Sequence, residues 1–325
     1  MSDPVLGVPG SVVAQAPDGL PEVREGDDLL DLLDHVLPLA DLVDGDVLVV
    51  TSKVVSKAEG RVVAGTREEL LAGETARVVA RRGPTTIVRT HHGLTMAAAG
   101  IDGSNVRAGH AVLLPRDPDA SAARLRAGLA RRTGRSVGVV VSDTAGRAWR
   151  EGQTDIAVGA AGIVPLVSFA GRRDAHGNEL AVTAPAVADE VAGLAELASG
   201  KLGGRPVTLV RGLAHLVLPL GEDGAGAAAL VRPDGGDLFG YGAREAVLRA
   251  LTADPADQRA FGSPVSREEL LGALGRVGVS ALPEGEHEVV APDSPAVRAV
   301  VFAHGWEPVP GSASDAGLRW RAPTP

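Results

Sequence analysis

Only three lysines occur among the 325 residues of the chain, Lys53, Lys57 and Lys201, and each lies in a stretch rich in serine, threonine or glycine. The other basic side chains are arginines. A lysine ammonium is a compact point charge, whereas a guanidinium is a planar fork, so the two groups hold anions differently. We therefore interpret the lysine-containing segments as candidate anion-binding sites.

The segment 51–61, TSKVVSKAEGR, carries the first two lysines directly after a β-branched run. Ser52, Lys53, Ser56 and Lys57 supply hydroxyl and ammonium groups, which together with backbone N–H groups can cradle an oligophosphate. The glycine spacing of a Walker loop is absent. Two interpretations remain open: a phosphate cradle, or a polar strand end with solvated lysines.

A second candidate segment, 97–109, has the sequence AAAGIDGSNVRAG. Asp102 lies between two glycines and is followed by Ser104 and Asn105. Glycines allow a ligand to approach the backbone closely, and a carboxylate beside an amide suits a hard cation carrying phosphate oxygens. The pattern taken alone favours an Asx-type turn, which needs no ligand.

The third segment, 139–155, is VVVSDTAGRAWREGQTD. Asp143 follows a long apolar run, at the place where α/β sheets carry catalytic groups, and Thr144 adds a hydroxyl. Arg147 and Arg150 come shortly after. A carboxylate and a hydroxyl beside arginines are suited to metal-bridged phosphoryl transfer. The alternative is a capped loop with structural ion pairs.

Composition excludes several other classes of protein. The formal net charge is −9, which disfavours non-specific binding to nucleic acid or to an anionic membrane surface. The chain has no cysteine, so disulfides and thiol catalysis are excluded. It shows neither an apolar run of membrane-spanning length nor the features of a signal peptide. We expect a cytoplasmic protein with no membrane or nucleic-acid partner.

The segments that must position these residues alternate between short β-branched runs and amphipathic helices, which predicts a mixed α/β fold. A change of composition after residue 233 suggests one domain over 1–240 and a small C-terminal α/β module over 245–325, with a partly disordered tail. The predicted strands are 45–55, 85–90, 111–115, 136–144, 206–212 and 286–292, and the predicted helices are 67–82, 120–134, 184–200, 243–252, 266–278 and 294–305.

Taken together, these segments resemble the γ-glutamyl ligases that build the tail of the deazaflavin coenzyme F-420. The resemblance covers roughly residues 5–235 and depends on the order and joint presence of its motifs. These include GLPEVREGDDL, GDVLVVTSKVVSKAEGR, HHGLTMAAAGIDGSNV, VVSDTAGRAWREGQTDIAVGAAGI and a segment that ends in SGKLGGRPVTLVRG.

The resemblance implies a GTP-dependent acid–amino-acid ligase, which joins L-glutamate to the lactyl carboxylate of the precursor F-420-0 and can add further γ-linked glutamates. It implies one or two Mg²⁺ or Mn²⁺ ions, with K⁺ as a further candidate. It also implies the family's own α/β fold and an intertwined homodimer rather than a Rossmann sheet.

Site residues carry over by position. Asp102 and Asp143 match metal-binding aspartates and are the expected catalytic centre, while Thr144 matches a ligand of a second metal. We add Arg147 as a catalytic candidate, because its guanidinium could hold a substrate carboxylate through two hydrogen bonds. The positions that match nucleotide contacts are Leu20, Pro21, Glu22, Val23, Ser52, Lys57, Asn105, Lys201 and Gly203.

Two departures from the family pattern affect these expectations. Archaeal relatives have a glutamine beside the second metal, where this chain has Lys201, so the number of ions is open. Mycobacterial relatives continue into a flavin-binding nitroreductase-like domain, but the roughly 80 residues of the C-terminal module are too few for that fold. We therefore predict no flavin.

Two other classes of function use the same residues. A metal-dependent phosphohydrolase would employ the aspartates with water as the nucleophile. A non-catalytic nucleotide-binding scaffold would use the C-terminal module to recruit a partner. Glutamate-dependent release of GDP would distinguish a ligase from both.

Overall fold

The computed structural model describes residues 10–233, 236–237, 239–285, 287–314 and 317–323. The chain divides into two compact units. The first runs to Val231 without Val79–Arg82, and the second consists of Val79–Arg82 and the chain from Arg232 onward. The sequence-based division into 1–240 and 245–325 stays a prediction about which parts fold as domains. In the described part of the chain, no helix is long and apolar enough to span a membrane.

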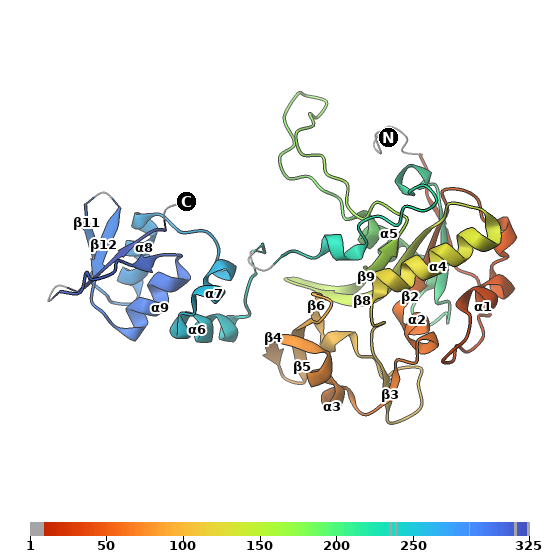
Figure 1. The fold of residues 1–325 in the computed structure, drawn as a ribbon, viewed down its shortest axis with the longest axis horizontal. Helices are drawn as coiled ribbons and strands as arrows, with labels where there is room; N and C mark the ends of the chain where they lie inside the picture. The colour runs from red at the N-terminus through yellow and green to blue at the C-terminus, as the bar shows by residue number, and fades with distance from the viewer. Residues whose placement is uncertain (1–9, 234–235, 238, 286, 315–316, 324–325) are drawn as a thin grey trace. The chain divides into compact units, whose positions relative to one another are not determined.

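The first unit is built on a five-stranded sheet with the order β1-β10-β2-β8-β9 (Figure 1). Only β2 and β8 run parallel, and the other neighbouring pairs are antiparallel. The mixed α/β class is therefore confirmed. The strands are β1 (Val13–Gln15), β2 (Val47–Thr51), β8 (Gly138–Arg147), β9 (Arg150–Ala161) and β10 (Val207–Arg211).

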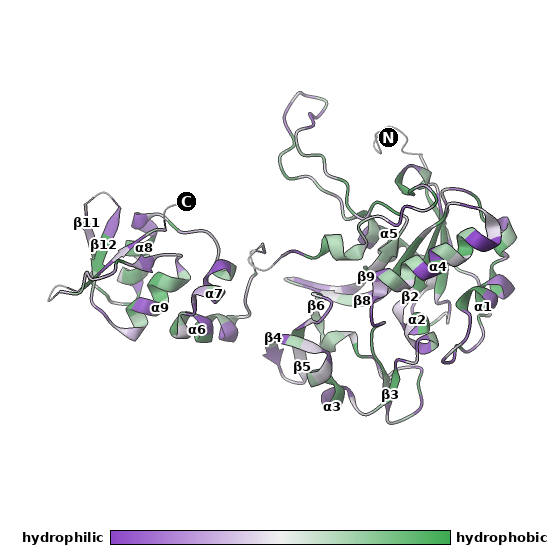
Figure 2. Cartoon of the chain, in the orientation of Figure 1, coloured by the Kyte–Doolittle hydropathy of each residue, from purple (hydrophilic) through white to green (hydrophobic). Residues whose placement is uncertain are grey.

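Helices cover both faces of this sheet. Alternate residues of β2 divide between two cores, because successive side chains of a strand point to opposite faces. Leu48 and Val50 pack in the core that includes residues of α1 (Leu29–Val36) and α4 (Pro118–Thr133). On the other face, Val47 and Val49 pack with residues of α5 (Val187–Ser199). Figure 2 shows the hydrophobic colouring of the sheet strands between these helices.

The long helices begin and end at the capping residues that the sequence contains. The side chain of Asp117 accepts a hydrogen bond from Ala120 N at 3.0 Å and begins α4. Gly134 ends this helix with a φ of 69°, a left-handed conformation that favours glycine. Gly200 likewise follows the last residue of α5 and has a φ of 65°. The predicted helices 120–134 and 184–200 are confirmed to within a few residues.

Two predictions about local structure are wrong. The segment 45–55, expected as a buried strand that runs into a polar turn, is a strand up to Thr51. In place of the turn, α2 (Ser52–Ala58) begins at the next residue, since Val54 and Val55 are buried on a helical face. The helix expected over 67–82 is only α3 (Arg67–Leu71), followed by β4 (Thr75–Arg82). Gly73 and the β-branched residues of β4 favour a strand there.

Smaller elements complete the first unit. A two-stranded sheet pairs β3 (Val62–Ala64) with β7 (His110–Val112), and a three-stranded sheet has the order β4-β5-β6. In this second sheet, β5 covers Thr85–Thr90 and β6 covers Thr95–Ala97. The short 3₁₀ helices of this unit are Leu39–Asp41, Ala72–Glu74, Ala98–Gly100, Ala214–Leu216 and Ala227–Leu230.

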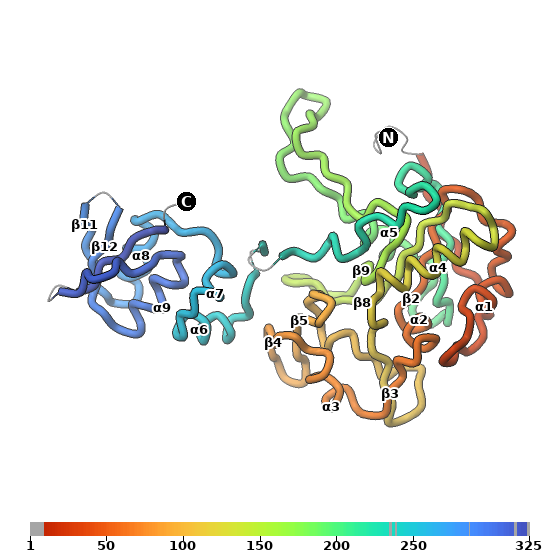
Figure 3. Tube along the Cα trace, in the orientation of Figure 1, coloured from red at the N-terminus to blue at the C-terminus, as the bar shows by residue number. Residues whose placement is uncertain are grey.

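Two segments extend from the sheet. The hairpin of β8 and β9 ends in a turn where Trp149 is 87 % exposed. A long excursion lies between β9 and α5 (Figure 3). Its two limbs are joined by hydrogen bonds from Phe169 N to Thr183 O at 2.9 Å and from Leu180 N to Arg172 O at 2.8 Å. Both segments carry polar side chains away from the core.

The second unit has its own core around Leu270, Leu274, Val301, Trp306 and Trp320. The tail expected to be partly disordered lies in part outside the described residues, and within it Leu318–Arg321 forms a strand in which Trp320 is only 3 % exposed. The sheet order is β11-β12-β14-β13. The elements are α6 (Ala243–Thr252), α7 (Pro255–Gln258), a 3₁₀ helix at Arg259–Phe261, α8 (Arg267–Arg276), β11 (Leu282–Glu284), β12 (Glu288–Ala291), α9 (Pro295–Ala303), β13 (Glu307–Pro308) and β14 (Leu318–Arg321).

Candidate functional site

A cavity of about 570 Å³ opens where the parallel strands β2 and β8 end or bend, beside the end of α5. Its walls come from five separate segments of the sequence, around residues 20–23, 49–57, 102–105, 142–155 and 195–208. All three lysines of the chain line it. The rarity of lysine in the sequence therefore pointed to one site rather than to three.

Lys57 is held at the cavity wall by a residue from the N-terminal segment. Its Nζ donates to Glu22 Oε1 at 2.5 Å. The Lys57 side chain is 8 % exposed, whereas that of Glu22 is 69 % exposed. The pairing links two predicted nucleotide contacts that are 35 positions apart in sequence. An ammonium kept at low exposure facing a cavity is available to an anion that enters.

Lys53 lies against the Asp102 turn. Its Nζ is 2.5 Å from Asp102 Oδ2 and donates to Ser104 Oγ at 2.7 Å. Ser104 N donates to Asp102 Oδ1 at 2.7 Å, so the Asx-type turn expected from the sequence is present. Burial works to raise the pKa of Asp102, but the hydrogen bonds from Lys53 and Ser104 outweigh it and lower the pKa overall. Asp102 is therefore a charged carboxylate.

Asp143 has no such neutralising partner. Ser52 Oγ donates to its Oδ1 at 3.1 Å, and within the described residues no lysine or arginine forms a salt bridge with it. The pKa of Asp143 is raised to about 7, mainly by burial and also by the charges of Asp155 and Asp102, while hydrogen bonds from Ser52 and the Thr144 backbone act to lower it. A buried carboxylate in this situation would be stabilised by a cation.

A third acidic residue, Asp155, was not singled out from the sequence. It is 7 % exposed and accepts hydrogen bonds from Thr144 Oγ1 at 2.8 Å and Ser142 Oγ at 3.1 Å. It also lies beside Glu196 of α5, and their hydrogen bond raises the pKa of Glu196. The β8–β9 register, in which Thr144 faces Asp155, brings these groups together. Predicting from the sequence that the chain forms a β-hairpin with its turn at Arg147–Arg150 would have placed Asp155 opposite Thr144.

A β-bulge between β8 and β9 changes the direction of the side chains next to Ser142. Val141 pairs with Gly159 and Ser142 pairs with Ala157, which leaves Val158 as the extra residue of β9. The parallel partner of Ser142 is Thr51, the last residue of β2. The sequence placed Asp143 at the end of a strand, but β8 continues to Arg147, so Asp143 lies at the bulge instead.

The donor set fits a divalent ion that is bound together with a phosphate ligand. No group of three or more histidine, aspartate or glutamate side chains in the described chain is arranged to hold a metal by itself. Mg²⁺ is usually held by one or two carboxylates, with waters and substrate phosphates completing the octahedron. Asp143 and Asp102 influence each other electrostatically and both line the cavity, so they offer this kind of incomplete site.

Most of the residues that the sequence singled out line this one cavity. Three of the predicted site residues do not: Ser52 donates to Asp143, Gly203 lies in the loop after α5, and Arg147 donates from Nη2 to Glu151 O at 2.7 Å near the hairpin turn. Ser56 and Arg150 are likewise not part of the lining. The position of Arg147 within one chain gives no support to its predicted catalytic role. The predicted residues on the wall are Leu20, Pro21, Glu22, Val23, Lys57, Asp102, Asn105, Asp143, Thr144 and Lys201.

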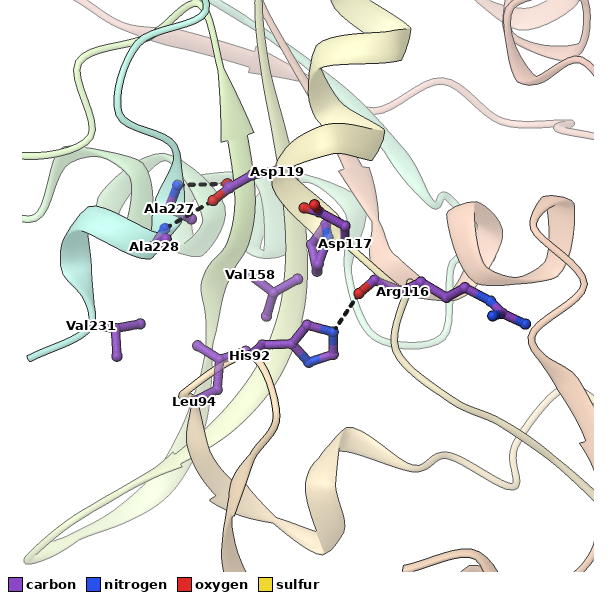
Figure 4. Close-up of a pocket in the computed structure, with 10 residues that line it drawn as sticks. His92, Leu94, Arg116, Asp117, Asp119, Val158, Ala227, Ala228 and Val231 are labelled. Atoms are coloured by element: carbon purple, nitrogen blue, oxygen red, sulfur yellow. Dashed lines mark hydrogen bonds between the residues drawn. The ribbon is translucent and has the colours of Figure 1, made fainter. Parts of the chain in front are cut away.

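A second cavity, of about 260 Å³, is lined by structural anchors (Figure 4). Asp119 accepts hydrogen bonds from Ala227 N at 2.7 Å and Ala228 N at 3.1 Å, and it also binds Ala160 N at 2.8 Å. The imidazole Nε2 of His92 lies 3.0 Å from Arg116 O. These contacts join loops to the sheet.

Comparison with known proteins defines the family. The model of the family described as "F420-0:Gamma-glutamyl ligase" matches residues 19–68 and 65–212. The match includes every residue of the predicted site. The chain belongs to the F420-0:gamma-glutamyl ligase family, as the motifs indicated.

Three archaeal relatives illustrate the similarity. "Coenzyme F420:L-glutamate ligase" of Methanothermobacter thermautotrophicus is 37 % identical over 247 residues, which are 68 % of this chain and 96 % of that protein. The proteins of the same name from Archaeoglobus fulgidus and Halobacterium salinarum are 40 % and 43 % identical, over 60 % and 61 % of this chain and 86 % of each relative. This chain is longer than these relatives, and its C-terminal part lies beyond the family match.

Proposed function

We propose that this protein joins L-glutamate to the carboxylate of the coenzyme F-420 precursor F-420-0 in a GTP-dependent reaction. Further γ-linked glutamates would be added by the same chemistry. The observation that carries the proposal is the convergence of family motifs from five parts of the sequence on one cavity that holds all three lysines and Asp143.

The chemistry requires activation of a carboxylate. A carboxylate is a poor electrophile, so amide formation needs a better leaving group on the acyl carbon. Attack of the precursor carboxylate oxygen on the γ-phosphorus of GTP forms an acyl phosphate and releases GDP. The amino group of glutamate then attacks the acyl carbon, phosphate leaves, and the amine loses a proton as the amide forms.

The chain's own residues are suited to hold the nucleotide. Lys57 presents an ammonium of low exposure, and Lys53 lies next to the Asp102 turn. Asn105 has a φ of 56° in this turn and also faces the cavity. Charged hydrogen bonds from lysine to phosphate are roughly twice as strong as neutral ones. We assign these three side chains to the phosphate groups.

Asp143 and Asp102 would hold a divalent ion, Mg²⁺ or Mn²⁺. When bound, such an ion neutralises charge on the phosphate oxygens and orients the γ-phosphate for transfer. Ser52 and the Thr144 backbone hold the Asp143 carboxylate in place by their hydrogen bonds. The lowered pKa of Asp102 keeps that carboxylate ionised for the same purpose.

Mass spectrometry tests the proposal directly. Purified protein is incubated with F-420-0, GTP, Mg²⁺ or Mn²⁺ and L-glutamate, and product masses increase by one glutamyl residue at a time. GDP release that depends on both glutamate and precursor supports the ligase. GDP release without either acceptor indicates a phosphohydrolase, and GTP binding without turnover indicates a scaffold.

We also propose a homodimer, following the family resemblance. The hairpin with the exposed Trp149 and the excursion before α5 are two segments of this unit that extend from the sheet (Figure 3). Light scattering coupled to size-exclusion chromatography would give twice the chain mass. A monomeric mass in an active preparation would contradict this part of the proposal.

A further inference from the structure

Lys201 makes contacts of the kind that a bound cation makes. It directly follows Gly200, the C-cap of α5. Its Nζ donates to Thr144 Oγ1 at 2.7 Å, and it lies 3.3 Å from Glu196 Oε1. A hydroxyl oxygen and a carboxylate oxygen from two different elements therefore surround one ammonium group.

The carboxylate of Asp155 orients the hydroxyl group of Thr144 that contacts Lys201. Thr144 Oγ1 donates its proton to Asp155 Oδ1 at 2.8 Å, so its oxygen lone pairs face Lys201. Asp155 in turn lies against Glu196. Hydroxyl and carboxylate oxygens are the ligands that Mg²⁺ and Ca²⁺ select in proteins. The oxygen atoms around the Lys201 ammonium are thus of the kind that bind a hard metal ion. The ammonium already supplies a positive charge at this position.

Lys201 and a metal ion cannot both use this position. A protonated amine has three donors and no acceptor, so it cannot act as a ligand. A divalent ion on Thr144 Oγ1 would lie next to the ammonium and be repelled by it. The sequence comparison led us to expect Thr144 as a ligand of a second metal, and the contacts of Lys201 do not fit that expectation.

The surroundings of Asp143, where the first divalent ion is expected, differ from those of Thr144. Asp143 lines the same cavity, yet its side-chain partner is the Ser52 hydroxyl and no lysine or arginine of the described chain forms a salt bridge with it. Lys53 pairs with Asp102 and not with Asp143, so an ion held mainly by Asp143 reaches Asp102 only if the Lys53 ammonium turns toward the phosphate groups. A divalent ion at Asp143 would meet an unneutralised carboxylate, whereas one at Thr144 would meet the Lys201 ammonium.

We propose that the ammonium of Lys201 is the second cation of this site, so that the nucleotide-loaded chain binds one divalent ion instead of two. The inference rests on the proposed function for the identity of the nucleotide. It assigns a role to one residue of the chain and restricts the metal to the side of the cavity formed by Asp143 and Asp102.

The test counts ions rather than turnover. Wild-type protein, Lys201→Gln and Lys201→Met are titrated with Mn²⁺ in the presence of a non-hydrolysable GTP analogue, and free Mn²⁺ is followed by electron paramagnetic resonance. Glutamine offers an amide oxygen in place of the charge, whereas methionine removes the charge without adding an oxygen. We expect one bound ion per wild-type chain, two for Lys201→Gln and one for Lys201→Met.

Two tightly bound ions in the wild type, or no gain in a folded Lys201→Gln variant, would overturn the inference. Arg135→Gln serves as the comparison, because Arg135 pairs with Asp44 at 3.6 Å and does not line the cavity, so this variant should not add an ion. The analogue is measured separately by equilibrium dialysis. If neither the wild type nor any variant binds the analogue, the proposed function fails. The Mn²⁺ titration repeated with inorganic triphosphate then still decides the inference, because Lys201→Gln should bind one ion more than the wild type.

Discussion

The hydroxyl of Ser52 donates to the carboxylate of Asp143 at 3.1 Å, although the two residues are 91 positions apart in sequence. Ser52 is the first residue of α2, directly after β2, and Asp143 lies on β8. The parallel pairing of Thr51 with Ser142 places them side by side. The phosphate-cradle segment and the acidic segment are thus one site because two strands are neighbours.

Asp143→Asn should abolish ligation while leaving the fold intact. The amide keeps a similar shape but removes the negative charge that would hold the divalent ion. The measurement is glutamyl addition by mass spectrometry, normalised to folded protein by circular dichroism. Turnover near the wild-type rate in a folded variant would remove Asp143 from the reaction.

The same substitution should stabilise the protein when metal and nucleotide are absent. Because the pKa of Asp143 is raised to about 7, the folded chain binds a proton more tightly than the unfolded chain does. Ionising Asp143 in the folded chain therefore lowers the free energy of unfolding. This loss is absent well below pH 4, grows as pH rises from 4 to 7 and then levels off. Asp143→Asn removes it, on the order of 2–4 kcal/mol at pH 8 and much less near pH 4.

Urea unfolding in a chelating buffer at pH 4.5 and pH 8 measures this difference. The free energy of unfolding of the variant should exceed that of the wild type more at the higher pH. An equal difference at both values would show that Asp143 is not the buried titrating group. Saturating Mg²⁺ and GTP should favour the wild type instead, since ligands that bind only the folded state add stability.

Lys57→Ala should weaken GTP binding by about 1.5–3 kcal/mol, the usual scale for losing a charged hydrogen bond. Glu22, its partner at 2.5 Å, is largely exposed, so leaving it unpaired costs little folding stability. Lys57→Arg should restore the affinity only partly, because a planar fork does not fit a position with 8 % exposure built for an ammonium. Calorimetric titration of GTP compares the three proteins, and unchanged affinity in the alanine variant would exclude Lys57 from the site.

Asp155→Asn should lower the rate of ligation at least about tenfold without unfolding the chain. Asp155 accepts from both Ser142 and Thr144, and an amide retains only one acceptor oxygen, so one buried hydroxyl loses its partner at a cost of about 1–3 kcal/mol. Asp44→Asn is the matched control, because Asp44 is exposed and lies before the other end of β2. If both variants behave alike in the ligation assay, Asp155 has no special role.

Much of the site could be predicted because its residues belong to short motifs with unusual composition. The lysines, Asp102 and Asp143 stood out in this way, and the cavity contains all of them. Asp155 and Glu196 could not be found so easily, since their importance depends on the register of β8 with β9 and on the packing of α5. Long-range pairing of this kind leaves no local signal in a single sequence.

The errors in the fold prediction have the same origin. The segment 67–82 has helical charge placement, with acidic residues early and arginines late, yet Thr75–Arg82 forms a strand. Its β-branched residues Thr75, Val78 and Val79 favour a strand and outweigh the charge pattern. Similarly, Trp320 joins the core of the second unit through the pairing of β12 with β14, which the polar composition of the tail concealed.

Truncation after residue 240 should leave a first unit that folds, binds GTP and adds glutamate. The prediction follows from the confinement of the family match to residues 19–212 and of the whole cavity lining to residues 20–208. One structural detail complicates it, since Val79–Arg82 of β4 belongs to the second compact unit. Removing the rest of that unit therefore leaves Val79–Arg82 without the residues with which it clusters, although β5 remains next to β4 in the sheet.

Solubility must consequently be separated from activity in this experiment. Glutamate addition and GTP affinity are both measured per folded molecule, and a second truncation after residue 231 tests whether the linker matters. We expect both properties within a few-fold of the full-length values. A folded truncation that binds GTP normally but cannot add glutamate would mean that the second unit contributes to binding of the precursor or of glutamate, because nucleotide binding alone would then be insufficient for the reaction.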